Sequence, residues 1–187
     1  SLFVYQRPTS LYVLRFPLKF MHKSIRRLSI RKRDRRLLLN RISEALKINA
    51  EEKFGSKPKM EIIEIGEEKI YLLNDKPILA SIGDIIFPTL LFKEYVDCLP
   101  KVIVDMGAVP HICNGADVMA PGIVDINGEF EEKALVAVID ERNRRPIAIA
   151  QALVDSEDAK AARRGKVFKN LHYVGDEIWD IIRTMLR

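Results

Sequence analysis

The sequence of 187 residues has little cysteine, histidine or glutamine, and these shortages exclude several kinds of site. Two cysteines, Cys98 and Cys113, are too few for a disulfide framework, and three scattered histidines form no zinc motif. We expect both cysteines to be reduced and mostly buried. Gln occurs only at Gln6 and Gln151, whereas Lys, Arg, Glu and Ile are plentiful, a thermophile-like composition. In such a protein a Cys98–Cys113 bridge is the alternative.

Long apolar runs are also missing, because no stretch approaches the roughly twenty residues of a transmembrane helix. The apolar start, Leu2 to Met21, is interrupted by basic residues and prolines, and it lacks the features of a signal peptide. We therefore expect no membrane partner and a cytoplasmic location. Residues 1–22 stay unplaced: they fit an upstream extension of a start at Met21, or a strand over Leu11 to Leu14.

Motifs of catalysis and cofactor binding are absent. The chain has no phosphate-binding loop of NTPases, no dinucleotide glycine fingerprint, no nucleophile elbow and no paired metal ligands. An acid pair of Asp105 and Asp125 is disfavoured, because Asp105 precedes a glycine turn, where it is expected to cap a helix. We expect a protein that is not an enzyme, with no catalytic residue, no cofactor and no metal.

What the chain does contain is a core-forming composition and an uneven charge. Hydrophobic residues make up 48% and charged residues 30%. Residues 1–50 hold thirteen Lys and Arg against two acids, a net +11, whereas residues 51–187 hold eighteen against twenty-four, a net −6. Eight of the basic residues lie between Lys23 and Arg36. This polarisation indicates a polyanionic partner at one end, with salt bridges to the acidic remainder as the alternative.

The basic run leads into a predicted amphipathic helix. One helical face is predicted from Leu38, Ile42, Ala45 and Leu46, with Ser29 as N-cap and an end near residue 48. On that helix, three basic side chains at i+4 spacing would share a face and repel one another unless RNA phosphate or an acidic neighbour compensates. These side chains are Arg27, Arg31 and Arg35.

The remaining pattern predicts an α+β fold class. In the first half we expect a loop over 49–59, strands over 60–65, 69–73 and 77–82, and a short helix after Pro88. From Pro100 many short strands are typical of a small closed or pseudo-barrel. The expected strands are 102–104, 118–126, 134–140, 147–154 and 171–174, with helices over 107–115 and 156–164, the second capped by Ser156.

Several motifs in the second half carry a family resemblance. Asp105-Met-Gly-Ala108, Asn114-Gly-Ala-Asp-Val-Met119 and Ala120-Pro-Gly-Ile123 are similar to the opening of a PUA domain, named after pseudouridine synthase and archaeosine transglycosylase. The segment from Gly165 to Trp179 resembles the closing strand of the malignant T-cell-amplified protein family and its archaeal relatives. The N-terminal half of that family ends in an aromatic-Pro-Thr helix, matched here by Phe87-Pro88-Thr89-Leu90.

The resemblance implies a small α+β pre-PUA domain at 23–98 and an RNA-binding PUA pseudo-β-barrel at 99–187. The segment 100–187 is expected to fold in isolation. In PUA domains RNA lies against a glycine-flanked helix, the following strand and the closing strand. The matching positions are Gly107, Ala108, Asn114, Gly115, Met119, Pro121, Gly122 and residues 170–173, including Asn170. The alternative is that the glycines only shape tight turns.

Histidines and basic residues complete the candidate RNA site. His111 and His172 are candidates for stacking on a base, although a structural role is common for single histidines. Met119 and Trp179 are more typical of core packing. A second basic cluster flanks the proposed surface and is a candidate for phosphate contact. It consists of Arg163, Arg164, Lys166 and Lys169.

The expected function is therefore non-enzymatic RNA binding. The resemblance implies a translation-associated factor that contacts rRNA or tRNA at the small ribosomal subunit, with a translation-factor partner protein and without DNA. One alternative is an accessory RNA-binding subunit of a tRNA or rRNA modification system. Another is a basic protein-interaction module. The catalytic domains that often accompany a PUA domain are far larger than the about ninety residues upstream.

Overall fold

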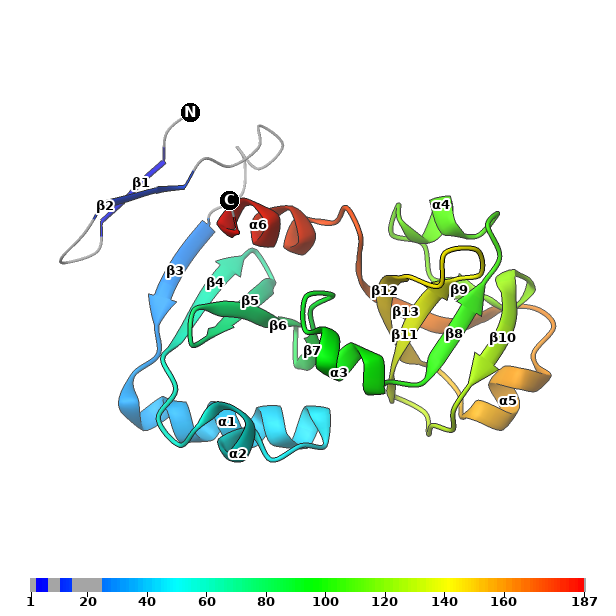
Figure 1. The fold of residues 1–187 in the computed structure, drawn as a ribbon, viewed down its shortest axis with the longest axis horizontal. Helices are drawn as coiled ribbons and strands as arrows, with labels where there is room; N and C mark the ends of the chain where they lie inside the picture. The colour runs from blue at the N-terminus through cyan, green and yellow to red at the C-terminus, as the bar shows by residue number, and fades with distance from the viewer. Residues whose placement is uncertain (1–2, 7–10, 15–24, 187) are drawn as a thin grey trace.

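The computed structural model describes residues 3–6, 11–14 and 25–186. Within these residues the strands form three sheets, of two, five and six strands (Figure 1). The smallest pairs β1 (Phe3–Gln6) with β2 (Leu11–Leu14), so the strand over 11–14, one of the two alternatives for this segment, is present. The rest of the segment 1–22 lies outside the described residues.

The first domain is an antiparallel five-stranded sheet in the order β3-β4-β5-β6-β7. The two-residue turn between β5 and β6 places Asn74 and Asp75 at positive φ, a geometry that suits the twist of a tight hairpin. The elements are β3 (Ile25–Ser29), α1 (Lys32–Leu46), α2 (Ala50–Phe54), β4 (Met60–Ile65), β5 (Glu68–Leu73), β6 (Lys76–Ile82), β7 (Ile85–Pro88) and α3 (Lys93–Cys98).

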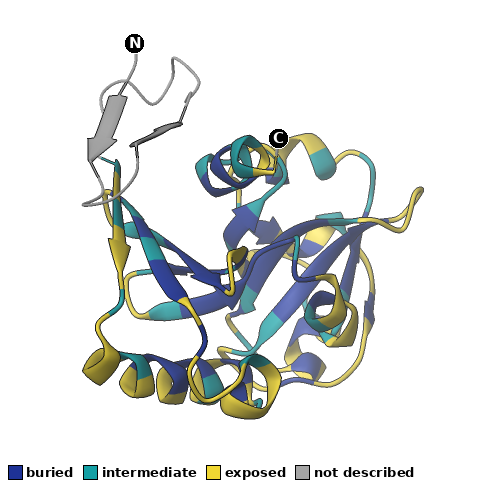
Figure 2. Cartoon of the chain, turned by 60° about the vertical axis from the view of Figure 1, so that its left-hand side comes forward, coloured by how far each residue is buried: buried dark blue, intermediate teal, exposed yellow. Residues whose placement is uncertain are grey.

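Helix α1 covers one face of this sheet and exposes its outer side to solvent (Figure 2). It begins inside the basic run, as expected, but its N-cap is Arg31 and not Ser29, because Ser29 still pairs with Glu61 in the sheet. The buried face uses Leu39, whereas Ala45 is exposed. The helix ends at Leu46 because Lys47 adopts the left-handed conformation, with φ 53°.

Two further expectations for this domain are only partly confirmed. The segment 49–59 is not only a loop, because α2 forms there, with the Asn49 side chain accepting the Glu52 N–H at 3.2 Å. Residues around Pro88 form the strand β7, and the expected helix starts only at Lys93. Pairing with β6 extends the sheet into this apolar stretch, which local propensity alone does not reveal.

The second domain is a six-stranded sheet in the order β10-β8-β11-β12-β13-β9, which curls into the pseudo-barrel expected from the strand pattern. Strands β8 and β11 are parallel, and the other pairs are antiparallel. The elements are β8 (Lys101–Val104), α4 (Val109–Ile112), β9 (Val118–Met119), a 3-10 turn (Ala120–Gly122), β10 (Ile123–Asn127), β11 (Leu135–Asp140), β12 (Pro146–Ala152), α5 (Ser156–Ala161), β13 (Lys166–Tyr173) and α6 (Glu177–Met185).

Three boundaries in this domain differ from expectation. The strand expected over 118–126 is divided by the 3-10 turn, where the chain crosses from β13 to β8. Strand β13 begins at Lys166 and not at Leu171. Asp155 caps α5 in place of Ser156, accepting the Asp158 N–H at 2.9 Å.

The C-terminal helix α6 joins the two domains. It follows the second domain in the chain but lies over the first sheet, on the face opposite α1 (Figure 1). Its buried residues Ile178, Ile181 and Ile182 belong to one cluster with Ile63 and Ile70 of the first sheet, and Trp179 packs against that cluster. The same cluster contains residues of β11, β12 and β13, so the domains share a hydrophobic core.

Both cysteines are free in the structure, and the half-buried Cys113 has a thiol pKa raised by burial. Cys98 is exposed, which corrects the expectation that both are mostly buried. Of the helices within the described ranges, none is both long and apolar enough to cross a membrane.

Candidate nucleic-acid interface

The proposed RNA surface is built around α4, which is a single helical turn. The Asp105 carboxylate accepts the Ala108 N–H at 2.8 Å, but Ala108 is itself the N-cap residue of α4 and makes no side-chain cap bond, so Asp105 closes the turn before the helix and the predicted capping role is wrong. This bond uses one of the N–H groups at the start of the helix that could otherwise meet a phosphate, and Pro110 has no N–H to offer. The four-residue helix also has too few peptide units for a strong dipole. Phosphate binding by the start of this helix is therefore not supported.

Asn170 and Asp117 hold the loop after α4 against strand β13. The Asn170 side-chain amide donates to the carbonyl oxygens of Ile112 at 3.0 Å and Ala116 at 2.9 Å. Asp117 accepts the Asn170 backbone N–H at 2.8 Å and pairs with Lys166 at 2.5 Å. Burial alone would raise the pKa of Asp117, but the bonds from Lys166 and Asn170 outweigh it and lower that pKa. Asn170 is thus a positioning residue, and sequence analysis missed Asp117 although it lies inside a quoted motif.

The candidate glycines are required by the packing of the turns. Gly115 has φ +93°, and a Cβ added there would lie 3.1 Å from the Tyr173 hydroxyl. A Cβ on Gly122 would lie 2.9 Å from the Ala108 Cβ, closer than real carbon contacts. The alternative in which these glycines shape tight turns therefore has direct structural support.

Several expected residues do face solvent around this turn. We call them, with the turn itself, the α4 surface: the exposed Gly107, His111, Asn114, Met119 and Pro121, and the half-buried Ala108 and Gly122. Met119 is 47% exposed, so core packing is the wrong interpretation for this side chain. An exposed methionine and an exposed histidine offer the kind of surface on which an unpaired base can pack.

His172 is a correction, because its side chain is completely buried. Its Nδ1 atom lies 2.7 Å from the Asp176 carboxylate, and its ring stacks on Phe87 with centroids 6.3 Å apart. Asp176, the N-cap of α6, also accepts the N–H groups of Tyr173 and Trp179. His172 is therefore part of the hydrogen-bond network that begins this helix. A ring enclosed in this way presents no face to RNA.

The basic cluster beside β13 is only partly available. Lys166 is paired with Asp117. The other members are exposed, and in the described part of the chain they form no ion pair with a carboxylate: Arg163, Arg164 and Lys169. They lie close to the α4 surface, because the Gly165 carbonyl accepts the Ala120 N–H at 2.9 Å.

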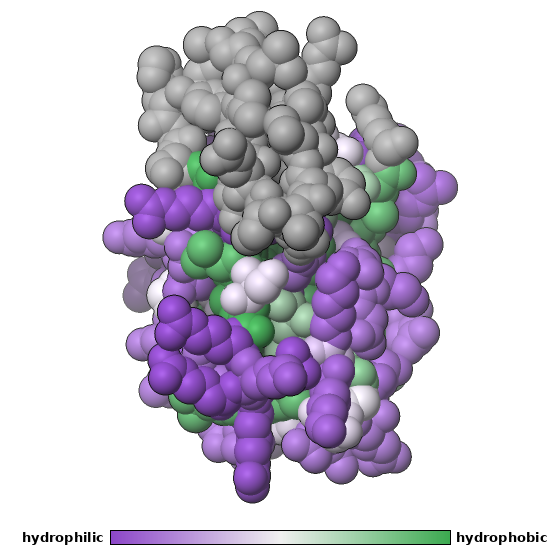
Figure 3. Space-filling view, turned by 90° about the vertical axis from the view of Figure 1, so that its left-hand side faces the viewer, coloured by the Kyte–Doolittle hydropathy of each residue, from purple (hydrophilic) through white to green (hydrophobic). Residues whose placement is uncertain are grey.

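The three arginines of the first domain do not share a helical face. Arg27 lies in β3 and pairs at 2.6 Å with Glu61, which is only 2% exposed. Arg31 is the N-cap of α1, and Arg35 lies in its first turns. The expectation of one basic helical stripe is wrong because strand pairing continues to Ser29 and Ile30, with Ile30 N–H donating to Met60 at 3.1 Å. This side of the molecule is still rich in hydrophilic side chains (Figure 3).

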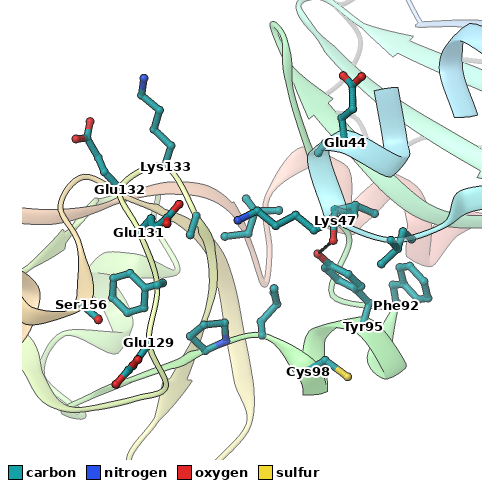
Figure 4. Close-up of a pocket in the computed structure, with 18 of the residues that line it drawn as sticks. Glu44, Lys47, Phe92, Tyr95, Cys98, Glu129, Glu131, Glu132, Lys133 and Ser156 are labelled. Carbon is teal, nitrogen blue, oxygen red and sulfur yellow. Dashed lines mark hydrogen bonds between the residues drawn. The ribbon is translucent and has the colours of Figure 1, made fainter. Parts of the chain in front are cut away.

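A cleft of about 1130 Å³ opens between the two domains. Side chains from α1 and α3 face the β10–β11 segment across it (Figure 4). The Tyr95 hydroxyl donates to Leu46 O at 2.6 Å, and burial raises the pKa of Tyr95 to about 12. The lining carries five carboxylates against three lysines: Glu44, Glu94, Glu129, Glu131 and Glu132 against Lys47, Lys53 and Lys133. This acidic balance disfavours RNA phosphate in the cleft.

The described residues contain no group of three or more His, Cys, Asp or Glu side chains that could hold a metal ion.

Comparisons with known proteins agree with this architecture. The PUA domain family matches residues 100–174, and the family described as domain of unknown function DUF1947 matches residues 26–96. An uncharacterized protein of Methanocaldococcus jannaschii is 42% identical over 135 residues, which cover 71% of this chain and 82% of that protein. Translation machinery-associated protein 20 of Saccharomyces cerevisiae is 25% identical over 138 residues, covering 70% and 76%.

A solved structure shows the same fold. The crystal structure of a PUA domain from Aeropyrum pernix K1, a tartrate complex, has a TM-score of 0.72 and 28% identity, and the match covers 88% of this chain and 95% of that one. The chain therefore belongs to the family that combines a DUF1947 domain with an RNA-binding PUA domain, the family of the malignant T-cell-amplified proteins, translation machinery-associated protein 20 and their archaeal relatives.

Proposed function

We propose that this protein binds structured rRNA or tRNA on the α4 surface and acts as a translation-associated factor at the small ribosomal subunit. The observation that carries the proposal is the position of Arg163 and Arg164. Both are exposed, both lack a carboxylate partner among the described residues, and both adjoin the turn that ends at Gly122. Arginine is well suited to phosphate, because its planar fork makes two hydrogen bonds at once.

The link to translation is carried by the relatives. Translation machinery-associated protein 20 bears the association in its name, and this chain spans 76% of that protein's length, both domains included. No catalytic motif was found in the sequence, and the α4 surface consists of backbone turns beside exposed arginines, in place of a nucleophile with its base. A binding role without catalysis is therefore the proposal.

RNA binding is tested by filter-binding titrations of a structured rRNA fragment at several salt concentrations. With about four to seven phosphate contacts, log K should fall with log salt at about 0.7 to 0.9 per contact. The double substitution Arg163→Gln/Arg164→Gln should reduce that slope by up to about two. The matched control Lys57→Gln/Lys93→Gln removes the same charge from exposed positions of the first domain and should leave the slope unchanged.

The ribosomal role is tested by sedimentation. The protein should travel with small ribosomal subunits, and ribonuclease treatment should release it. Binding to free RNA without co-sedimentation would favour an accessory role in RNA modification. No RNA binding at low salt would contradict the whole proposal.

A further inference from the structure

The hairpin between β11 and β12 carries basic side chains that are not part of the proposed RNA site. Its tip, Arg142 to Arg145, holds three arginines in four residues, and all three are exposed. No carboxylate within the described ranges forms an ion pair with any of them. By contrast, Arg27 and Lys166 are neutralised by internal carboxylates. The structure therefore leaves a dense free positive charge at this tip, which we call the arginine hairpin: Arg142, Arg144 and Arg145.

Hydrogen bonds to Asp140 fix the backbone conformation of the arginine hairpin. Asp140, only 4% exposed, accepts the N–H of Asn143 at 2.5 Å and that of Arg145 at 3.2 Å. The Asp140 carbonyl accepts the Arg144 N–H at 3.1 Å, and Arg144 takes a positive φ of 56°. These bonds use backbone groups, so the three guanidinium groups remain at the surface. A turn fixed in advance loses less entropy when it binds a ligand.

The arginine hairpin is also fastened to the α4 surface. The Glu141 side chain accepts the Met106 N–H at 3.0 Å, and the Glu141 N–H donates to Val104 O at 3.0 Å. The next residue, Asp105, donates its N–H to Gly122 O at 3.0 Å. Figure 1 shows the β11–β12 turn beside α4. The arginine hairpin therefore adjoins the α4 surface at the Asp105 loop, whereas Arg163 and Arg164 adjoin it at the 3-10 turn.

We propose that the arginine hairpin is a second phosphate-binding site for RNA, separate from the basic cluster beside β13. An RNA strand that lies on the α4 surface would place its backbone against Arg163 and Arg164 on one side and against the arginine hairpin on the other. The guanidinium forks bind phosphate oxygens in pairs and carry no base preference. This inference rests on the proposed function, because it extends the RNA path that the proposed function begins.

The test is a filter-binding titration of the structured rRNA fragment with the full chain carrying Arg142→Gln/Arg145→Gln. These substitutions keep the backbone N–H groups that Asp140 accepts, and Arg144 is left in place because of its positive φ. We expect binding weakened by about ten-fold or more and a salt slope lower by up to about two. The control Lys57→Gln/Lys93→Gln should bind as the parent does.

Charge-conserving variants separate phosphate contact from damage to the turn. Arg142→Lys/Arg145→Lys should restore most of the salt slope, because lysine keeps the charge but loses the fork. If the lysine variant binds as weakly as the glutamine variant, with the same low slope, the phosphate contact is contradicted. If the parent binds RNA and the glutamine variant matches it, the arginine hairpin is not a site, while the proposed function stands. If the parent itself fails to bind RNA, the proposed function fails first.

Discussion

At the residue scale, three acidic side chains decide which cations are free to meet a ligand. Glu61 neutralises Arg27, Asp117 neutralises Lys166, and Asp140 binds backbone N–H groups and leaves its neighbouring arginines exposed. A count of charges along the sequence treats all these cations alike. The difference between them depends on contacts between residues far apart in the chain, as with Arg27 and Glu61.

Asp140 is expected to make stability depend on pH. Burial alone would raise its pKa, but the hydrogen bonds from Asn143 and Arg145 outweigh burial and lower it below the ordinary value of 3.8. A lowered pKa in the folded state stabilises the fold fully above the unfolded-state value, and this contribution is lost as pH falls through the folded-state value.

Asp140→Asn should therefore destabilise the protein at pH 7 by about 1–3 kcal/mol, since the neutral amide keeps fewer of these bonds. The difference from the parent should persist down to about pH 4 and shrink below pH 3.8. Urea unfolding at a series of pH values measures it. A difference that stays constant through the acid range would show that the carboxylate charge is not what stabilises the turn.

Residue identity alone could predict part of the site. The pattern of an acid before a glycine turn placed Asp105 at the start of α4, where its carboxylate accepts the Ala108 N–H, although it does not cap the helix. His172 was misjudged because nothing in its own segment shows that Phe87, from the other domain, covers its ring. Met119 was expected in the core but is exposed, because it lies in the two-residue strand β9 at the edge of the sheet.

At the scale of elements, the boundary between β3 and α1 sorts the basic residues into two roles. Arg27, on the strand, is part of a mostly buried ion pair. Lys32 and Arg36 are exposed at i+4 spacing on α1, and no ion pair is formed by either one within the described residues. The first role supports the fold, whereas the second leaves charge available to a polyanion.

Two variants should separate these roles. Arg27→Gln should lower the free energy of unfolding by about 1–3 kcal/mol, because the ion pair between Arg27 and Glu61 is lost, and should leave the salt slope of RNA binding unchanged. Lys32→Gln/Arg36→Gln should leave the melting temperature within a few degrees of the parent and lower the salt slope by up to about two. Thermal unfolding and filter binding of both variants give the comparison. A reversed pattern would mean that β3, not α1, meets the RNA.

The start of α1 also shows why element boundaries resist prediction. Helical periodicity placed the apolar face of α1 near its true position, because that signal is local. The first residue of the helix is decided by how far β3 stays paired with β4, and this pairing partner lies more than thirty residues away in the printed register, Ser29 with Glu61. Strand pairing outweighed a favourable N-cap residue.

At the scale of the whole molecule, the two domains share one hydrophobic core, and we therefore expect them to unfold together. Ile181 is fully buried in α6, in one cluster with residues of both sheets. The sequence predicted two domains in order, and the described strands form two large sheets in that order. It did not predict that a helix after the PUA pattern returns to the first sheet, because amphipathicity shows that a face is buried but not against what.

Ile181→Ala should destabilise the protein by about 2–5 kcal/mol through the cavity it leaves. The loss of amide protection should appear in β4 and β5 of the first domain as well as in the second domain, because α6 packs on both. Native-state hydrogen exchange shows which amides lose protection. Increased exchange confined to strands β8 to β13 would contradict a shared core and would support independent folding of residues 100–187.

The position of α6 has a consequence for folding during synthesis. Domains usually complete themselves in order as the chain leaves the ribosome, the N-terminal one first. Here α6 emerges after every other described element, and until it does, Ile63 and Ile70 of the first sheet lack the helix that covers them. We therefore expect the first sheet of the nascent chain to keep an apolar face exposed to solvent while the whole second domain is synthesised. We expect the final packing of this sheet to come last in folding, although its strands are the first of the two large sheets to be synthesised.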